Sequence, residues 1–171
     1  RCDIPAARTL SLASPARYLN PKGKETARSG RFEGSATYVA CDQTMRVAFS
    51  ASYGDNNLGV FPLDAQGAPH AASQTETELP RAHCARMDAT NRWLLVPMLG
   101  VDAISCYCLG DDLRLTPNNP AMTRVRPGSG PRHLVFSRDN RHVHCLNELD
   151  GSIDLFDFDV VDGTLTLKQS S

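Results

Sequence analysis

The chain has 171 residues, enough for one ordinary domain with a sizeable core. Its 18 Lys and Arg residues against 19 Asp and Glu residues give a formal net charge of -1, which excludes a general electrostatic attraction to nucleic acid or to an anionic membrane. No apolar run approaches the roughly 18 residues of a membrane span. Asp3 and Pro5 interrupt the stretch where a signal peptide would be apolar. We therefore expect a cytoplasmic protein without nucleic-acid or membrane partners.

Residues 1–32 are the least regular part of the chain, because prolines and glycines separate short apolar pieces. A basic cluster lies within them, at Lys22, Lys24, Arg28 and Arg31. It lacks the interleaved aromatic residues of a nucleic-acid surface, so we interpret it as solvated. The sequence predicts a poorly defined N-terminal segment, either a loop or the remnant of an earlier structural unit.

From Gly34 onward the sequence repeats itself. The segments 35–42 and 81–88 align, and the aspartates that close them, Asp42 and Asp88, are 46 residues apart. A third copy begins at residue 131, and an aromatic residue recurs late in each copy, as Phe61, Tyr107 and Phe156. Testing for repeats of this length comes before assigning elements, because such a period is typical of propellers and solenoids.

Each repeat divides into short strands bounded by turn residues. In the first copy we expect strands over residues 37–41, 46–52 and 58–63, with a weak fourth over 73–79. Helical periodicity is absent, and four antiparallel strands in about 40–50 residues are the signature of a β-propeller blade. The sequence thus predicts an all-β fold of about three blades, at approximately 33–79, 80–126 and 127–171.

Three blades are too few for a closed ring, since propellers close with about four to eight. Open sheet edges invite association with other chains. We expect the chain to be a piece of a longer protein. The alternative is that copies self-associate through their open blade edges to complete a ring.

Six cysteines lie in apolar, strand-like segments: Cys2, Cys41, Cys84, Cys106, Cys108 and Cys145. Cysteine packs as a small hydrophobic residue, so this placement favours buried free thiols over disulfides. Cys106 and Cys108 would share one face of a strand, but no second Cys or His pair lies at zinc spacing. We expect no metal site.

Equivalent positions of the repeats indicate a candidate site. His83 and Arg132 are 49 residues apart, at the loop that leads into the first strand of consecutive copies. In a propeller this loop lies beside the central channel, so both side chains could face one cavity. Glu148 stands where the earlier copies have Leu99 and Tyr53. Arg132 and Glu148 could form a structural ion pair or a catalytic carboxylate with its guanidinium neighbour.

Three histidines and one asparagine surround this candidate site in sequence. Asn147, beside Glu148, could orient a substrate hydroxyl. His133 is a weaker candidate for substrate binding. His142 and His144 match Trp93 and Leu95 of the second copy, so the pattern predicts packing positions for them.

Two motifs carry a family resemblance. The run GSGPRH over residues 128–133, followed by NEL over 147–149, resembles the seven-bladed β-propeller lactonases. The run AHCARMDATNRWLLVPMLGVDAI over 82–104 is similar to the preceding segment of that family and places His83 on its active-site histidine. The resemblance extends from about Gly34 to about Leu167 and implies seven blades in a complete member.

This resemblance implies the hydrolysis of 6-phospho-D-glucono-1,5-lactone to 6-phosphogluconate in the oxidative pentose phosphate pathway, without a metal or an organic cofactor. It further implies that His83, Arg132 and Glu148 line the site of a phosphorylated sugar lactone. His83 or Glu148 would act as general base on water, and Arg132 would stabilise the oxyanion or hold an anionic group. A lactonizing isomerase of the muconate type and a non-catalytic interaction scaffold remain alternatives, because fold alone does not separate them.

Overall fold

The computed structural model describes residues 17–19, 25–28 and 35–171. Most of the predicted N-terminal segment lies outside these residues, and so do Cys2 and the basic cluster except Arg28. The described parts consist of strands and one short 3-10 helix, with these bounds: β1 (Arg17–Leu19), β2 (Glu25–Arg28), β3 (Tyr38–Cys41), β4 (Val47–Ser52), β5 (Asn57–Pro62), β6 (Gln74–Glu76), β7 (Arg86–Met87), β8 (Trp93–Met98), η1 (Leu99–Val101), β9 (Ala103–Leu109), β10 (Leu115–Arg124), β11 (Pro131–Phe136), β12 (His142–Asn147), β13 (Ile153–Phe158) and β14 (Leu165–Ser170).

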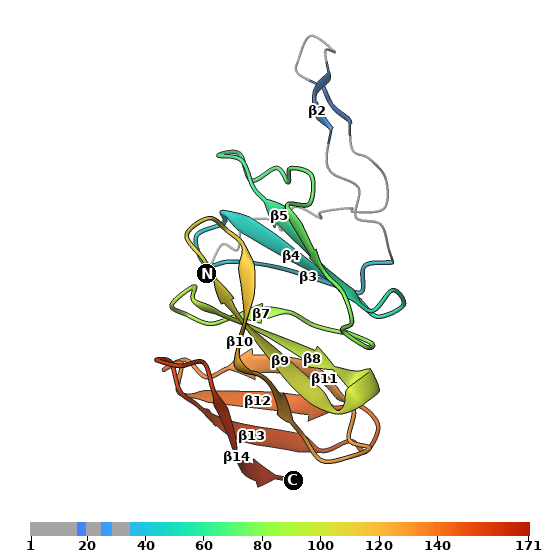
Figure 1. Cartoon of the computed structure of the whole chain (residues 1–171), viewed down its shortest axis with the longest axis vertical. Helices are drawn as coiled ribbons and strands as arrows, with labels where there is room; N and C mark the ends of the chain where they lie inside the picture. Colours follow the sequence, from blue (N-terminus) through green and yellow to red (C-terminus); the bar gives the residue numbers. More distant parts are fainter. Residues whose placement is uncertain (1–16, 20–24, 29–34) are drawn as a thin grey trace, which may run out of the picture.

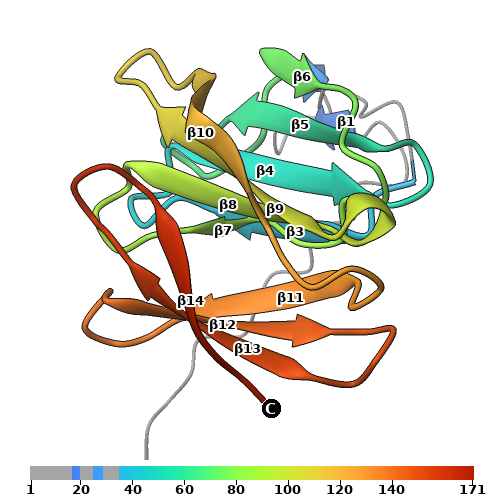
Figure 2. The same ribbon diagram turned by 60° about the horizontal axis from the view of Figure 1, so that its bottom comes forward.

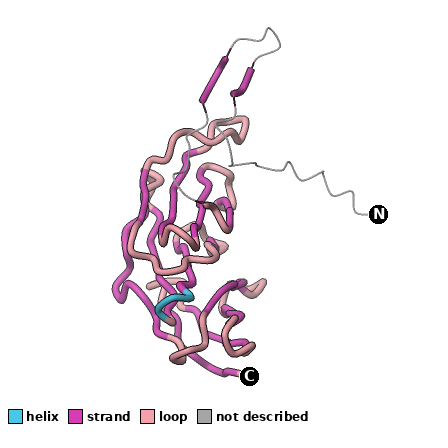
Figure 3. The backbone as a smooth tube through the Cα atoms, turned by 90° about the vertical axis from the view of Figure 1, so that its right-hand side faces the viewer, coloured by secondary structure: helices cyan, strands magenta, loops and turns pink. Residues whose placement is uncertain are grey.

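Three four-stranded antiparallel sheets follow one another along the chain. Strands β3 to β6 form the first sheet, β7 to β10 the second and β11 to β14 the third, and within each sheet the strands lie in chain order. A separate antiparallel pair joins β1 to β2. Figure 1 shows the three sheets one after another along the long axis, and Figure 3 shows that strands and loops make up the described chain apart from the short helix η1. The all-β fold of four-stranded antiparallel units predicted from the repeats is confirmed.

Figure 2 shows the second sheet between the first and the third. Neighbouring sheets pack against each other through apolar side chains. Phe49 and Val60 of the first sheet meet Leu94 and Tyr107 of the second in one buried cluster. A second cluster lies between the second and third sheets. Burying a large apolar side chain contributes about 1.5–3 kcal/mol relative to leaving it exposed, so these two interfaces are the main source of stability.

Each repeat turns from its first to its second strand in the same way. Asp88 Oδ1 accepts hydrogen bonds from the amides of Arg92 and Trp93, both at 2.9 Å. Asp42 does the same for the amides four and five residues after it. In the third sheet the Ser137 hydroxyl takes the place of the carboxylate, accepting from the amides at positions 141 and 142. The repeated spacing found in the sequence is therefore the repetition of one hydrogen-bonded turn.

The Asp88 turn also joins neighbouring sheets. Asn140, in the equivalent turn of the third sheet, donates to Asp88 Oδ2 at 2.9 Å and accepts from the Ala89 amide at 3.1 Å. Asn91 accepts from the Gln43 amide of the first sheet in the same manner. Burial alone would raise the pKa of Asp88, but hydrogen bonds from Thr90, Trp93 and Asn140 outweigh burial and lower it.

The described cysteines are all free, and two of them, Cys41 and Cys108, are only partly buried. Cys84, Cys106 and Cys145 are buried, and burial raises the pKa of both Cys106 and Cys145 to about 12. Among the residues that the structure describes, no three His, Cys, Asp or Glu side chains gather as metal ligands would. The described part of the chain also contains no helix long and apolar enough to cross a membrane.

The third sheet buries one face only. Burial alternates along β12, where Val143, Cys145 and Asn147 are buried while His144 and Leu146 are exposed. The predicted packing position of His144 is therefore wrong. Its counterpart Leu95 is buried because sheets cover both faces of the second sheet, whereas within the described residues no sheet covers the His144 face.

Candidate functional site

The predicted residues His83, Arg132 and Glu148 lie together at one end of the sheets. Arg132, on β11, donates from Nε to His83 Nε2 at 3.0 Å. The same Nε lies 2.8 Å from Glu148 Oε2, an ion pair. His83 belongs to the loop before β7 and Glu148 to the turn after β12, so two sheets supply the three side chains.

The repeat explains why Arg132 and Glu148 meet. In the first sheet their equivalents, Thr37 and Tyr53, are also in contact, because the Tyr53 amide donates to the Thr37 hydroxyl at 3.0 Å. In the third sheet the Glu148 amide donates to the Gly130 carbonyl at 2.8 Å, which fixes the turn against the loop before β11. The loop before the first strand thus contacts the turn after the second strand in both sheets. In the third sheet the two contacting side chains carry opposite charges.

The His83 imidazole is nearly enclosed, with 9% of the residue exposed. His133 lies edge-on to it, with ring centroids 5.0 Å apart, and Tyr53 of the first sheet lies on another side at 5.7 Å. Burial is the main cause that lowers the pKa of His83, and the charge of Arg132 lowers it further. The ring is therefore neutral at pH 7.

Hydrogen bonding assigns the His83 tautomer. Because Arg132 Nε is a donor, His83 Nε2 must be an acceptor, so the neutral ring carries its proton on Nδ1. Nδ1 is buried and has no hydrogen-bond partner among the described residues. In this neutral form Nε2 holds the basic lone pair of the ring, so His83 can take up a proton from water once the hydrogen bond from Arg132 is released.

Arg132 and Glu148 remain accessible, since their side chains are 39% and 41% exposed. Only Nε of Arg132 is engaged by the described part of the protein. The two terminal nitrogens are thus left to donate to an anion, in the paired geometry that suits carboxylate, phosphate or an oxyanion.

The two predicted substrate-binding residues are placed differently. His133 stands in the site against His83, and burial lowers its pKa as well, followed by the charges of His83 and Arg132. Asn147 is fully buried on the other side of its strand, where its amide donates to Ser152 Oγ and Asp154 Oδ2, both at 2.9 Å. The structure does not bring Asn147 to the site, because consecutive residues of a strand face opposite sides.

The first sheet adds residues that the sequence did not single out. Tyr38 packs its ring near His133, at a centroid distance of 6.0 Å, and accepts a hydrogen bond from Arg86 at 3.3 Å. Arg81 lies over the Tyr53 ring at 5.7 Å. Tyr53 was visible in the repeat alignment as the counterpart of Glu148, which is the signal that could have found it.

The sequence of the chain matches a known protein family. The pattern that defines the family "Lactonase, 7-bladed beta-propeller" matches residues 16–171. The chain belongs to the seven-bladed β-propeller lactonase family. Members contain seven blades by that description, and the chain spans less than half the length of the relatives described below.

Two curated relatives are named 6-phosphogluconolactonase. The one from Yersinia pestis (strain Pestoides F) is 38% identical over 123 residues, 72% of this chain and 37% of the relative. The one from Serratia proteamaculans (strain 568) is 37% identical over 137 residues, 80% of this chain and 41% of the relative.

Solved structures of similar proteins share the fold. The periplasmic gluconolactonase of Pseudomonas aeruginosa matches with a TM-score of 0.77 at 27% identity, over 89% of this chain and 47% of that one. A protein from Lactobacillus plantarum matches with a TM-score of 0.72 at 27% identity, over 80% of this chain and 42% of that one.

Proposed function

We propose that this lactonase-family chain supplies active-site residues for the hydrolysis of 6-phospho-D-glucono-1,5-lactone to 6-phosphogluconate, in the cytoplasm. The observation that carries the proposal is the contact of one guanidinium with both a neutral, buried imidazole and a carboxylate. The names of the curated relatives support the phosphorylated sugar lactone as substrate.

In this proposal, His83 or Glu148 removes a proton from water as the water attacks the lactone carbonyl. The oxygen of that carbonyl becomes negatively charged in the tetrahedral intermediate. Arg132 stabilises this oxyanion or holds an anionic group of the substrate. The ring oxygen then leaves and takes up the proton, so the step consumes one water and needs no redox partner.

The lowered pKa of His83 fits the role of base, because its free form is present at neutral pH. Glu148 fits through its exposure and its place beside Arg132. His133 and the two tyrosines of the first sheet would form the walls against the sugar ring.

The test is a hydrolysis assay of the protein produced from the complete reading frame that contains residues 1–171. Freshly prepared lactone is followed by a coupled measurement of 6-phosphogluconate, after subtracting spontaneous hydrolysis. We expect His83→Ala and Arg132→Ala each to lower kcat/KM by about 100-fold or more. His144→Ala is the matched control, because within the described residues His144 forms no hydrogen bond or ion pair with His83, Arg132 or Glu148, and its loss should leave the rate unchanged.

Isotope-labelled water separates hydrolysis from isomerisation, since only hydrolysis places an oxygen from water in the product carboxylate. A folded protein that releases no 6-phosphogluconate above the spontaneous rate would refute the proposal.

A further inference from the structure

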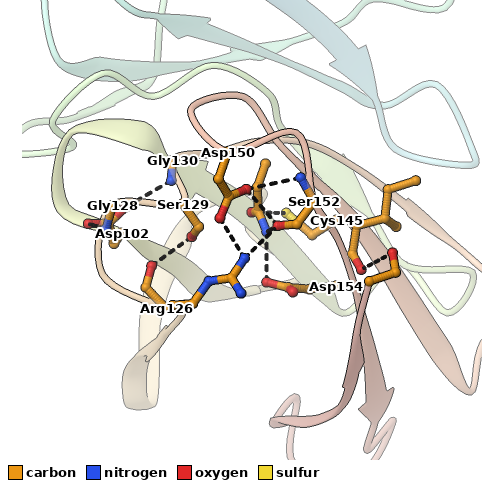
Figure 4. A network of polar contacts seen from close by, with 12 residues as sticks. Asp102, Arg126, Gly128, Ser129, Gly130, Cys145, Asp150, Ser152 and Asp154 are labelled. Atoms are coloured by element: carbon orange, nitrogen blue, oxygen red, sulfur yellow. Dashed lines mark hydrogen bonds and ion pairs between the residues drawn. The ribbon is translucent and has the colours of Figure 1, made fainter.

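The loop that leads to Arg132 is held from both sides (Figure 4). On one side Asp102, in the turn of the second sheet, accepts from the Gly128 amide at 2.8 Å and from the Gly130 amide at 2.9 Å. On the other side Arg126 forms an ion pair of 2.5 Å with Asp150, in the turn of the third sheet. Arg132 follows Gly130 by two residues, so these contacts fix where its strand begins.

A similar contact joins the turn of the first sheet to the loop before the second sheet. Asn56 lies 46 residues before Asp102, and its side-chain oxygen accepts from the Arg81 amide at 2.8 Å. Arg81 precedes His83 by two residues, as Gly130 precedes Arg132. The turns of the first and second sheets thus each brace the loop that carries the site residue of the next sheet.

The side chains of Asn56 and Asp102 are not needed to form their own turns. Both residues adopt the left-handed backbone conformation, with φ of 55° and 50°. The third sheet has Gly151 at the equivalent position, with φ of 71°, and makes the same kind of turn without a side chain. Glycine adopts this conformation most readily, so backbone conformation alone does not explain the asparagine and the aspartate at these positions. Their side chains instead accept hydrogen bonds from the loop of the next sheet.

We propose that Asn56 and Asp102 are positioning residues that hold His83 and Arg132 in contact. The inference rests on the proposed function, because the contact between His83 and Arg132 affects a reaction only if these residues form a lactone site. Hydrogen bonds of about 3 Å weaken steeply with displacement, and an error of about 1 Å in an active site can cost about 100-fold in rate. The loop before Arg132 contains two glycines in the left-handed conformation, Gly128 and Gly130. The hydrogen bonds from their amides to Asp102 restrict the positions that this loop can adopt.

The experiment uses NMR on the protein produced from the complete reading frame that contains residues 1–171, with the Arg132 Nε–H signal assigned by its loss in Arg132→Lys. Asp102→Gly removes both acceptor oxygens and keeps the turn conformation. We expect the Arg132 Nε–H proton to exchange with water at least about 10-fold faster in this variant. Asp102→Asn keeps one acceptor and should shift the signal of one glycine amide and, to a smaller extent, that of Arg132.

Asp159→Gly is the matched control. Asp159 also caps turn amides, those of Val161 and Asp162, but within the described residues it forms no hydrogen bond or ion pair with the loop before Arg132 and should leave the Arg132 signal unchanged. Asn56→Gly should likewise shift the His83 ring signals. An unchanged Arg132 Nε–H in both folded Asp102 variants would overturn the inference, and if only Asp102→Asn folds, its result alone decides.

Lactone assays of the same variants separate this inference from the proposed function. A loosened Arg132 in a protein whose unsubstituted form hydrolyses no lactone contradicts the function and supports the positioning. A rigid Arg132 in Asp102→Gly contradicts the positioning whatever the rate of hydrolysis.

Discussion

Gly130 is the residue whose substitution tests the geometry of the site most directly. It has φ of 66°, and a Cβ built there would lie 2.6 Å from Leu149 Cγ and 2.9 Å from Leu149 Cδ1. Gly130→Ala therefore combines a strained backbone with a steric overlap. Gly128, two residues earlier, has φ of 80° but no atom within 4 Å of its Cβ position, so Gly128→Ala is a control for the backbone cost alone.

The two costs can be estimated separately. A left-handed conformation costs a non-glycine residue about 1–2 kcal/mol, which is the loss expected for Gly128→Ala. Overpacking adds about 1–3 kcal/mol, so Gly130→Ala should lose about 2–5 kcal/mol. Leu149 is 58% exposed, so Leu149→Ala alone should cost little. In the double variant it removes the two closest atoms and keeps Leu149 Cβ at 3.3 Å, so the loss should fall most of the way to that of Gly128→Ala.

The assay is urea unfolding followed by the fluorescence of Trp93, the single tryptophan of the chain. The reasoning is wrong if Gly130→Ala is no less stable than Gly128→Ala. It is also wrong if Leu149→Ala gives no relief, because the overlap would then not be the cause.

Three further changes have defined outcomes. Burial lowers the pKa of His83 in the folded chain below the ordinary His value of about 6.5, so the unfolded chain binds more protons in that pH range. The free energy of unfolding should therefore fall as the pH falls. The urea midpoint should drop between about pH 8 and about pH 5.5, and it should drop less in His83→Gln. Asp88→Ala leaves the buried Trp93 amide without its acceptor and should cost about 1–3 kcal/mol or more, measured by the same unfolding. Gly163→Ala places a Cβ 2.5 Å from the Trp93 ring and should shift the tryptophan emission in the folded state, whereas Gly67→Ala, with open space around it, should not.

Much of the fold could be predicted because the same spacing of strands and turns occurs three times in the sequence. The aspartate turns at Asp42 and Asp88 mark where the first strand of a sheet ends and the second begins. In the first sheet these strands start at Tyr38 and Val47, within one residue of the predicted starts. The predicted blade limits of 33–79, 80–126 and 127–171 remain a prediction. The exposure of His144 could not be predicted, because the repeat shows which positions are equivalent but not which sheets have a neighbour on each face.

The candidate site was only partly visible in sequence. Spacing and family resemblance together indicated His83, Arg132 and Glu148, whose contacts the structure then showed. Asn147 was chosen for its place beside Glu148, but strand alternation sends neighbouring side chains to opposite faces, and its substrate role remains a prediction. The brace residue Asp102 went unnoticed, although its spacing from Asn56 equals that of the repeat.

The alkylation rate of the buried thiols can report how often neighbouring sheets separate. Cys84 and Cys145 lie near each other, in the second and third units, and burial raises the pKa of both. Only the thiolate reacts rapidly with alkylating reagents, so neither sulfur should react while the sheets are packed. Their labelling rate then equals the intrinsic rate multiplied by the fraction of time that the interface is open. A single labelling time course would therefore measure how tightly one unit of the repeat holds the next.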